Sequence, residues 1–212
     1  MSEAKLREEI CRIGASLYQR GFTVGTAGNI SARLDDGFLI TPTDACLGYL
    51  DPVKISKLGP NGEQISGDRA SKTIRLHRAV YESDSKLRGI VHTHSTHLVA
   101  LSLMQGIDEH NILSPLTPYH VMKAGKIPLI PYHRPGTAEI LDGLRALVPH
   151  VRGVMLQRIG PTFWHDSVAN ASFALEEAEE TAKLFFLTRG LALPPLTEDN
   201  IAELKQSFDV KW

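Results

Sequence analysis

Apolar residues recur every three to four positions in several stretches of the chain, and this spacing predicts amphipathic helices. The first stretch has charged residues between its apolar positions and ends at Gly21, a common residue after a helix C-terminus. In the longest stretch the acidic cluster from Glu176 to Glu180 is expected to face solvent. The predicted helices span residues 3–20, 98–104, 137–147 and 167–188. A further helix is predicted after Lys72, with Leu76 and Val80 on its apolar side.

Short apolar runs between these helices predict strands at residues 38–41, 127–132, 151–156 and 162–164, and a further strand that starts at residue 89 and runs through His92 and His94. Pro128 and Pro131 favour an edge or terminal position for residues 127–132, because proline cannot donate to a neighbouring strand. Turn-forming residues at 51–68 indicate hairpins between short strands. We therefore predict one mixed α/β domain over residues 1–212, with helices flanking a sheet that has much antiparallel pairing.

The composition is that of an ordinary soluble protein, with 42% apolar and 22% charged residues and a formal net charge of -1. No block of like charge favours binding to nucleic acid or to an anionic membrane. Cys11 and Cys46 have neither the spacing of a zinc motif nor the number for a disulfide framework. The sequence has no long apolar run and no secretory leader pattern, so we expect a cytoplasmic protein.

Three histidines follow the apolar run at residues 89–91: His92, His94 and His97. If the strand continues, His92 and His94 point to the same face about 7 Å apart at their α-carbons. Two neutral imidazoles in that arrangement can share a divalent metal ion, although such a site normally has three or four ligands. Coincidence or hydrogen bonding within the core is the alternative interpretation.

A second candidate site is the glycine-rich segment Gly25–Ser31, which we expect to be a loop. Its small residues allow backbone N–H groups to approach an anion, and Thr26 and Asn29 add side-chain donors. The segment lacks the Gly-Lys-Ser/Thr ending of a nucleotide-binding loop, and a tight structural turn explains it equally well.

Two further segments could also face an anion. The turn Thr41–Asp44 carries two threonine hydroxyls. Ser71 and Lys72 bring a hydroxyl and an ammonium to a helix N-terminus, which is a common place for phosphate binding. A serine at such a position is also an ordinary helix cap.

Taken together, these segments resemble the class II aldolase/adducin family, which includes fuculose-phosphate and rhamnulose aldolases and ribulose-phosphate 4-epimerase. The segments that carry the resemblance occur in the family's order: Gly25–Ser31, Thr41–Thr43, the region of Ser71, and Val91–His97. Within the family, three other segments look most like the 3-oxo-tetronate 4-phosphate decarboxylase branch: Cys46–Pro52, Thr117–Tyr119 and Pro131–Gly136.

The resemblance implies a three-layer α/β/α sandwich with a mostly antiparallel central sheet, assembled as a homotetramer with sites at subunit interfaces. It also implies that His92 and His94 ligate a divalent metal, commonly Zn²⁺, and that Tyr119 acts on a substrate bound to a neighbouring subunit. The residues that it implies for substrate phosphate are Thr26, Ala27, Gly28, Asn29, Thr43, Ser71 and Lys72.

Two positions depart from the family pattern. Ile159 stands where the family usually has a third metal-binding histidine, and Thr73 stands where it has a carboxylate four residues before His77. Isoleucine cannot ligate a metal, and threonine cannot serve as a carboxylate base. His97, His165, substrate oxygens or water are the remaining sources of a third ligand.

These features predict a metal-dependent carbon–carbon lyase acting on a small phosphorylated keto-sugar acid. Decarboxylation of a 3-oxo-tetronate 4-phosphate to dihydroxyacetone phosphate and CO2 fits Thr73 best, because loss of CO2 releases the electrons without a base. The alternatives are a sugar-phosphate aldolase of the fuculose-phosphate type, or a family member that binds ligand and has lost catalysis.

Overall fold

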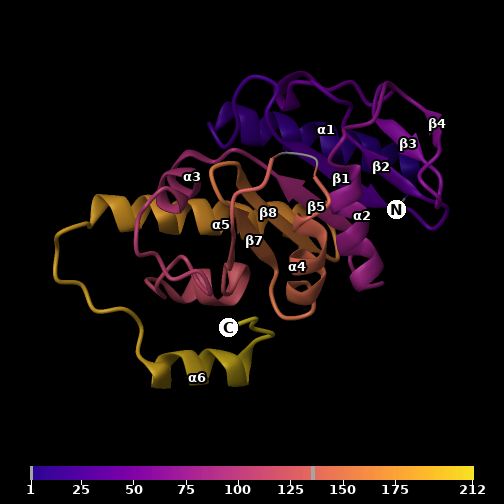
Figure 1. Cartoon of the computed structure of the whole chain (residues 1–212). Helices are drawn as coiled ribbons and strands as arrows, with labels where there is room; N and C mark the ends of the chain where they lie inside the picture. The colour runs from indigo at the N-terminus through magenta and orange to yellow at the C-terminus, as the bar shows by residue number, and fades with distance from the viewer. Residues whose placement is uncertain (1, 135–136) are drawn as a thin grey trace.

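An eight-stranded sheet forms the centre of the computed structural model, which describes residues 2–134 and 137–212 (Figure 1). The strand order is β4-β3-β2-β1-β5-β8-β7-β6, and all neighbouring strands are antiparallel except the pair β6 and β7. The strands are β1 (Asn29–Arg33), β2 (Phe38–Ile40), β3 (Ser56–Leu58), β4 (Gln64–Ser66), β5 (Gly89–His92), β6 (Leu129–Ile130), β7 (Gly153–Leu156) and β8 (Gly160–His165).

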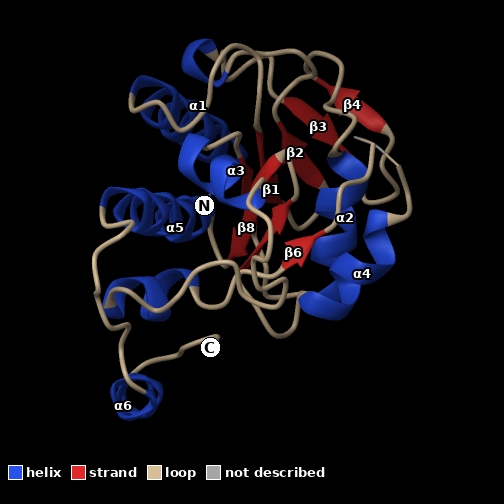
Figure 2. Ribbon diagram, turned by 60° about the vertical axis from the view of Figure 1, so that its left-hand side comes forward, coloured by secondary structure: helices blue, strands red, loops and turns tan. Residues whose placement is uncertain are grey.

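Helices cover both faces of this sheet, which gives the three-layer arrangement predicted from the sequence (Figure 2). Helices α1, α3 and α5 pack on one face, and α2 and α4 pack on the other. None of the helices in the described residues is long and apolar enough to cross a membrane. The helices are α1 (Glu3–Gln19), α2 (Ile74–Ser83), α3 (Thr96–Ser102), α4 (Ile140–Leu147), α5 (Val168–Leu187), α6 (Glu198–Ser207), the 3-10 turn η1 (Leu47–Tyr49) and the π-helical turn η2 (His120–Ala124).

Side chains on β5 alternate between the two helical layers. Ile90 packs in the cluster beneath α2 and α4, whereas Val91 packs beneath α1, α3 and α5. His92 is two residues beyond Ile90, so it points toward the α2/α4 layer. This alternation determines which helices can contribute residues around His92.

Most elements agree with the sequence pattern, and β6 lies at the sheet edge as its flanking prolines predicted. The prediction of a loop over Gly25–Ser31 is wrong at its end, because β1 begins at Asn29 and pairs with both β2 and β5. Helix α6 was not predicted, although Thr197 and Asn200 form a capping box at its start. The segment Pro131–Gly136 extends over two positions, 135 and 136, that lie outside the described residues.

The prediction that the whole acidic cluster on α5 faces solvent is wrong at Glu179. Glu179 is buried and accepts hydrogen bonds from the backbone N–H groups of His97 (2.9 Å) and Leu98 (2.9 Å). Its carboxylate also lies 2.8 Å from Nδ1 of His97. The reason is that α5 packs beside α3, whose first N–H groups have no partner within their own helix.

Candidate active site

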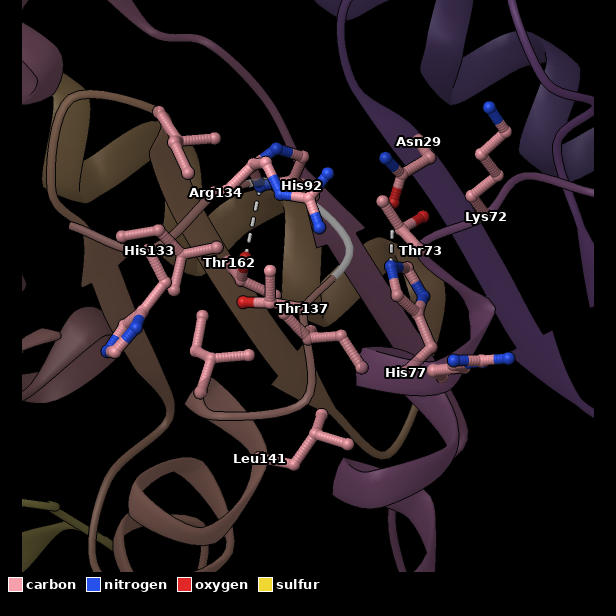
Figure 3. Close-up of a pocket in the computed structure, with 15 residues that line it drawn as sticks. Asn29, Lys72, Thr73, His77, His92, His133, Arg134, Thr137, Leu141 and Thr162 are labelled. Carbon is pink, nitrogen blue, oxygen red and sulfur yellow. Dashed lines mark hydrogen bonds between the residues drawn. The ribbon is translucent and has the colours of Figure 1, made fainter. Parts of the chain in front are cut away.

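Three polar side chains form a row across the middle of the sheet. Asn29 on β1 pairs with His92 on β5, and His92 pairs in turn with Thr162 on β8. Paired residues on neighbouring strands point to the same face, so all three lie beneath the α2/α4 layer. His77 of α2 lies over this row (Figure 3).

A cavity of about 70 Å³ opens between this row and the helices α2 and α4. Three cationic side chains line it: Lys72, Arg75 and Arg134. Within the described residues, no aspartate or glutamate lines the cavity. Ile159 and four other apolar side chains also line the cavity. The cavity is therefore suited to a small anionic ligand with some apolar surface.

His92 is held in one tautomer. Its Nδ1 lies 2.9 Å from the carbonyl oxygen of Pro161 and 3.0 Å from Oγ1 of Thr162. A carbonyl oxygen only accepts, so Nδ1 carries the proton and Nε2 keeps its lone pair. Burial lowers the pKa of His92 to about 3, with a further contribution from His94, so the imidazole is neutral at pH 7. This is the state in which a histidine binds a metal ion.

The His94 ring lies 5.2 Å from that of His92, centre to centre. The prediction that both residues belong to one continuing strand is wrong, since β5 ends at His92 and the chain turns toward α3. His92 is consequently buried, whereas His94 is exposed. The two rings nevertheless stay close enough to act on one ion.

Within the described residues, no third metal-binding side chain joins this pair. The described residues contain no group of three His, Cys, Asp or Glu side chains that could hold a metal. His97 is engaged with Glu179, and His165 pairs with Gly89 at the opposite end of β5. The donor set therefore fits a divalent ion held by two imidazoles, with its other ligands coming from outside the chain.

The three predicted anion-binding segments lie side by side. Thr41 connects them, because its Oγ1 accepts from the backbone N–H of Ile30 (3.2 Å) and its carbonyl accepts from that of Ser71 (3.3 Å). The backbone N–H of Thr43 donates to the Arg69 carbonyl at 2.8 Å. Tertiary hydrogen bonds thus bring together segments that are far apart in the sequence.

The predicted phosphate residues do not all line the cavity. Asn29 and Lys72 do, whereas Thr43 lines a separate cavity of about 360 Å³. The other predicted phosphate-binding residues line neither of these two cavities: Thr26, Ala27, Gly28 and Ser71.

Thr73 lines the cavity and is the N-cap residue of α2. Its Oγ1 lies 2.8 Å from Oγ of Ser71.

Tyr119 lies outside the cavity of its own chain. It precedes η2 and has a 60% exposed side chain. The described residues of one chain therefore do not bring Tyr119 to His92.

The sequence profile described as "Class II Aldolase and Adducin N-terminal domain" matches residues 8–186. The chain belongs to the class II aldolase/adducin family. It is 56% identical to 3-oxo-tetronate 4-phosphate decarboxylase of Cupriavidus necator, over 100% of this chain and 99% of that one. L-fuculose phosphate aldolase of Escherichia coli is a more distant relative, 29% identical over 98% of this chain and 96% of that one.

Solved structures of the family show the same fold. The crystal structure of YgbL from Escherichia coli superimposes with a TM-score of 0.93 at 43% sequence identity, covering 96% of this chain and 99% of that one.

Sequence reasoning assigned no role to six polar residues that line this cavity: Arg75, His77, His133, Arg134, Thr137 and Thr162. His77 had a detectable signal, because it is a polar residue on the helix face that also carries Val80. Arg134 belongs to the stretch Pro131–Gly136 that carried part of the resemblance, but only the tertiary structure brings its side chain to the cavity.

Proposed function

We propose that this chain is a carbon–carbon lyase that decarboxylates 3-oxo-tetronate 4-phosphate to dihydroxyacetone phosphate and CO2. The observation that carries the proposal is the charge of the cavity, which has three cationic side chains and, within the described residues, no carboxylate. The substrate carries a phosphate and a carboxylate, so it needs cationic partners at both ends. The name of the Cupriavidus necator relative supports this choice.

The two anionic groups have separate partners in the proposal. Lys72 and Asn29, at the end of the cavity near the start of α2, bind the phosphate together with the backbone of residues 26–28. Arg134 enters from the segment before α4 and binds the carboxylate (Figure 3). Ser71 and Thr43 support the phosphate-binding segments through their backbone N–H groups, which donate to the carbonyl oxygens of Thr41 and Arg69 respectively.

The reaction breaks the bond between the carboxylate carbon and its neighbour. The electron pair remains on the neighbouring carbon and is delocalised onto the ketone oxygen, and the carbon then takes up one proton. A divalent ion held by His92 and His94, commonly Zn²⁺ in this family, would supply positive charge beside the ketone. No step requires a carboxylate base, which is consistent with a threonine at position 73.

The proton donor is Tyr119 of a second copy. Because Tyr119 is exposed and lies outside the cavity of its own chain, it can reach the cavity of a neighbouring copy. Together with the family resemblance, this supports a homotetramer with sites between subunits. A phosphorylated sugar acid is a substrate of intracellular metabolism, and we therefore place the enzyme in the cytoplasm.

The test is to incubate the purified protein, loaded with a divalent metal, with 3-oxo-tetronate 4-phosphate. Release of CO2 and formation of dihydroxyacetone phosphate in equal amounts are expected. L-fuculose 1-phosphate serves as the parallel substrate. Cleavage of that compound to an aldehyde, without CO2 release from the keto acid, would overturn the proposal in favour of an aldolase.

Ile159 and Thr73 favour a second candidate, a family member that binds sugar phosphate without turnover. It predicts measurable binding of dihydroxyacetone phosphate but no CO2 release at any concentration of Zn²⁺, Mn²⁺ or Mg²⁺. Turnover with any of these ions rules it out.

A further inference from the structure

Four buried side chains form a continuous hydrogen-bonded chain that ends at the cavity. The Tyr81 hydroxyl lies 2.8 Å from Oγ of Ser31, and the same Oγ lies 2.7 Å from Nδ1 of His77. On the other side of the ring, Nε2 of His77 lies 2.6 Å from Oδ1 of Asn29. Tyr81, Ser31 and His77 have no exposed surface, and Asn29 is 6% exposed.

The far end of the chain is fixed by the packing of Tyr81. Its ring stacks on Phe38 with 5.4 Å between the ring centres, and the Arg33 guanidinium lies 5.1 Å from the ring centre on its face. The hydroxyl therefore has little freedom to find another partner. In the described residues, Ser31 is the only hydrogen-bond partner of that hydroxyl.

This arrangement determines where each proton lies. A fully buried hydroxyl must donate its proton, so Tyr81 donates to Oγ of Ser31. The Ser31 proton is then directed to Nδ1 of His77, which must be the unprotonated nitrogen. The His77 proton is consequently on Nε2 and is donated to Oδ1 of Asn29. The opposite direction leaves the buried Tyr81 proton without an acceptor.

The direction of these hydrogen bonds fixes the orientation of the Asn29 amide. We infer that His77 is a positioning residue that, together with Ser31 and Tyr81, holds Oδ1 of Asn29 away from the ligand and presents Nδ2 as a donor to a substrate oxygen. In the described residues Nδ2 has no hydrogen-bond partner, and Asn29 lines the cavity beside Lys72. Without this control the amide could rotate and place its carbonyl oxygen against an anion.

The inference rests on the proposed function only for the identity of the substrate, because the orientation of Asn29 can be measured without turnover. In protein labelled with ¹⁵N-histidine, the ring nitrogen shifts of His77 distinguish the two tautomers. The signal is assigned by its disappearance in His77→Gln. Protonation at Nε2 at pH 7 is expected, and protonation at Nδ1 overturns the inference whether or not the protein releases CO2.

Binding provides the second measurement, with inorganic phosphate and dihydroxyacetone phosphate as probes. Asn29→Asp keeps the acceptor for His77 and replaces the donor by a negative charge, so the affinity for both probes should fall by at least about tenfold. The unfolding midpoint should stay near that of the wild type. Unchanged affinity in this variant would show that Asn29 serves only as the acceptor for His77.

Rescue by a conservative change completes the test. His77→Gln can still donate to Asn29 through its amide nitrogen, whereas His77→Leu cannot. We expect the KM for the substrate to rise at least about tenfold in His77→Leu and to return toward the wild-type value in His77→Gln. If both variants fold and have the same KM, the orienting role of His77 is wrong.

Discussion

Gly28 packs directly against the backbone of His92: a Cβ built on Gly28 would lie 2.8 Å from the His92 carbonyl oxygen. That separation is shorter than a van der Waals contact, and Gly28 also has φ of +86°. The pairing of β1 with β5 begins at the next residue, Asn29. The absence of a side chain at position 28 therefore lets the glycine-rich segment reach the strand that carries His92.

The same segment contains a matched control for this contact. Gly25 also has positive φ, at +56°, but a Cβ there would meet nothing within 4 Å. Gly25→Ala should lower the free energy of unfolding by about 1 kcal/mol, which is the cost of the left-handed backbone alone. Gly28→Ala adds the clash and should cost about 2–3 kcal/mol, with weaker phosphate binding. Urea unfolding of both variants checks this, and equal losses would show that the contact with His92 is unimportant.

Ile159→His should supply the missing third imidazole, because the side chain at position 159 already lines the cavity. We expect the affinity for Zn²⁺ to rise by at least about tenfold, since catalytic zinc sites normally have three protein ligands. Ile159→Leu keeps the apolar wall and should leave the affinity unchanged. Calorimetric titration with Zn²⁺ measures both variants. No tightening in Ile159→His would mean that position 159 is not oriented toward the two histidines.

Arg134→Met should weaken binding of the substrate much more than binding of the product. If Arg134 binds the carboxylate, kcat/KM for 3-oxo-tetronate 4-phosphate falls about 10- to 100-fold, while the inhibition constant of dihydroxyacetone phosphate is unchanged. Lys72→Met is the matched variant and should weaken both compounds, because both carry the phosphate. Equal effects of Arg134→Met on both compounds would place the carboxylate elsewhere.

His120 predicts a specific pH dependence of stability. It is fully buried beside the Trp212 ring, and in the described residues neither of its ring nitrogens has a hydrogen-bond partner. Burial lowers the pKa of His120 from 6.5 to about 4. Between these two pH values the unfolded chain binds the proton and the folded chain does not, so stability falls as the pH falls, by up to about 1.4 kcal/mol per pH unit.

His120→Phe removes this titration and keeps a ring against Trp212. The variant should be at least as stable as the wild type at pH 7 and should lose less stability between pH 6.5 and pH 4. Urea unfolding at intervals across that range gives the two slopes. Identical slopes would assign the pH dependence to other groups.

Sharing of sites between subunits can be tested by mixing two inactive variants. His92→Ala removes a metal ligand, and Tyr119→Phe removes the proposed proton donor. If Tyr119 acts on the cavity of a neighbouring subunit, dissociating and reassembling the two proteins together creates some sites with both residues intact. Recovery of part of the wild-type CO2 release is expected, and a mixture as inactive as its components would place Tyr119 outside the reaction.

Sequence patterns predicted the helices and strands well where burial repeats regularly along the chain. They also singled out His92 and His94, whose rings lie 5.2 Å apart in the structure, and the role of this pair as metal ligands stays a prediction. The boundary of β1 was missed because glycines and polar residues precede it, and its pairing with two strands overrides that local preference. Glu179 was predicted to face solvent because the periodicity of one helix carries no information about its neighbours. The N–H groups at the start of α3, which have no partner in their own helix, hold this carboxylate in the interior.

The residues around the histidines were less predictable. His77, Asn29 and Ser31 are far apart in the sequence and meet only through strand register and the packing of α2. Arg134 reaches the cavity from a proline-containing segment with no periodic signal. The roles of these residues depend on how far apart the helices and strands lie in the folded chain. A pattern within one segment gives no information about that distance.

The position of β5 divides the site into two parts that come from different regions of the chain. β5 lies between β1 and β8, so the segments proposed to bind phosphate come from the N-terminal strands on one side. Ile159 and Arg134 come from later parts of the chain on the other side. Substitutions there can alter the metal ligands or the preferred substrate while phosphate binding is retained.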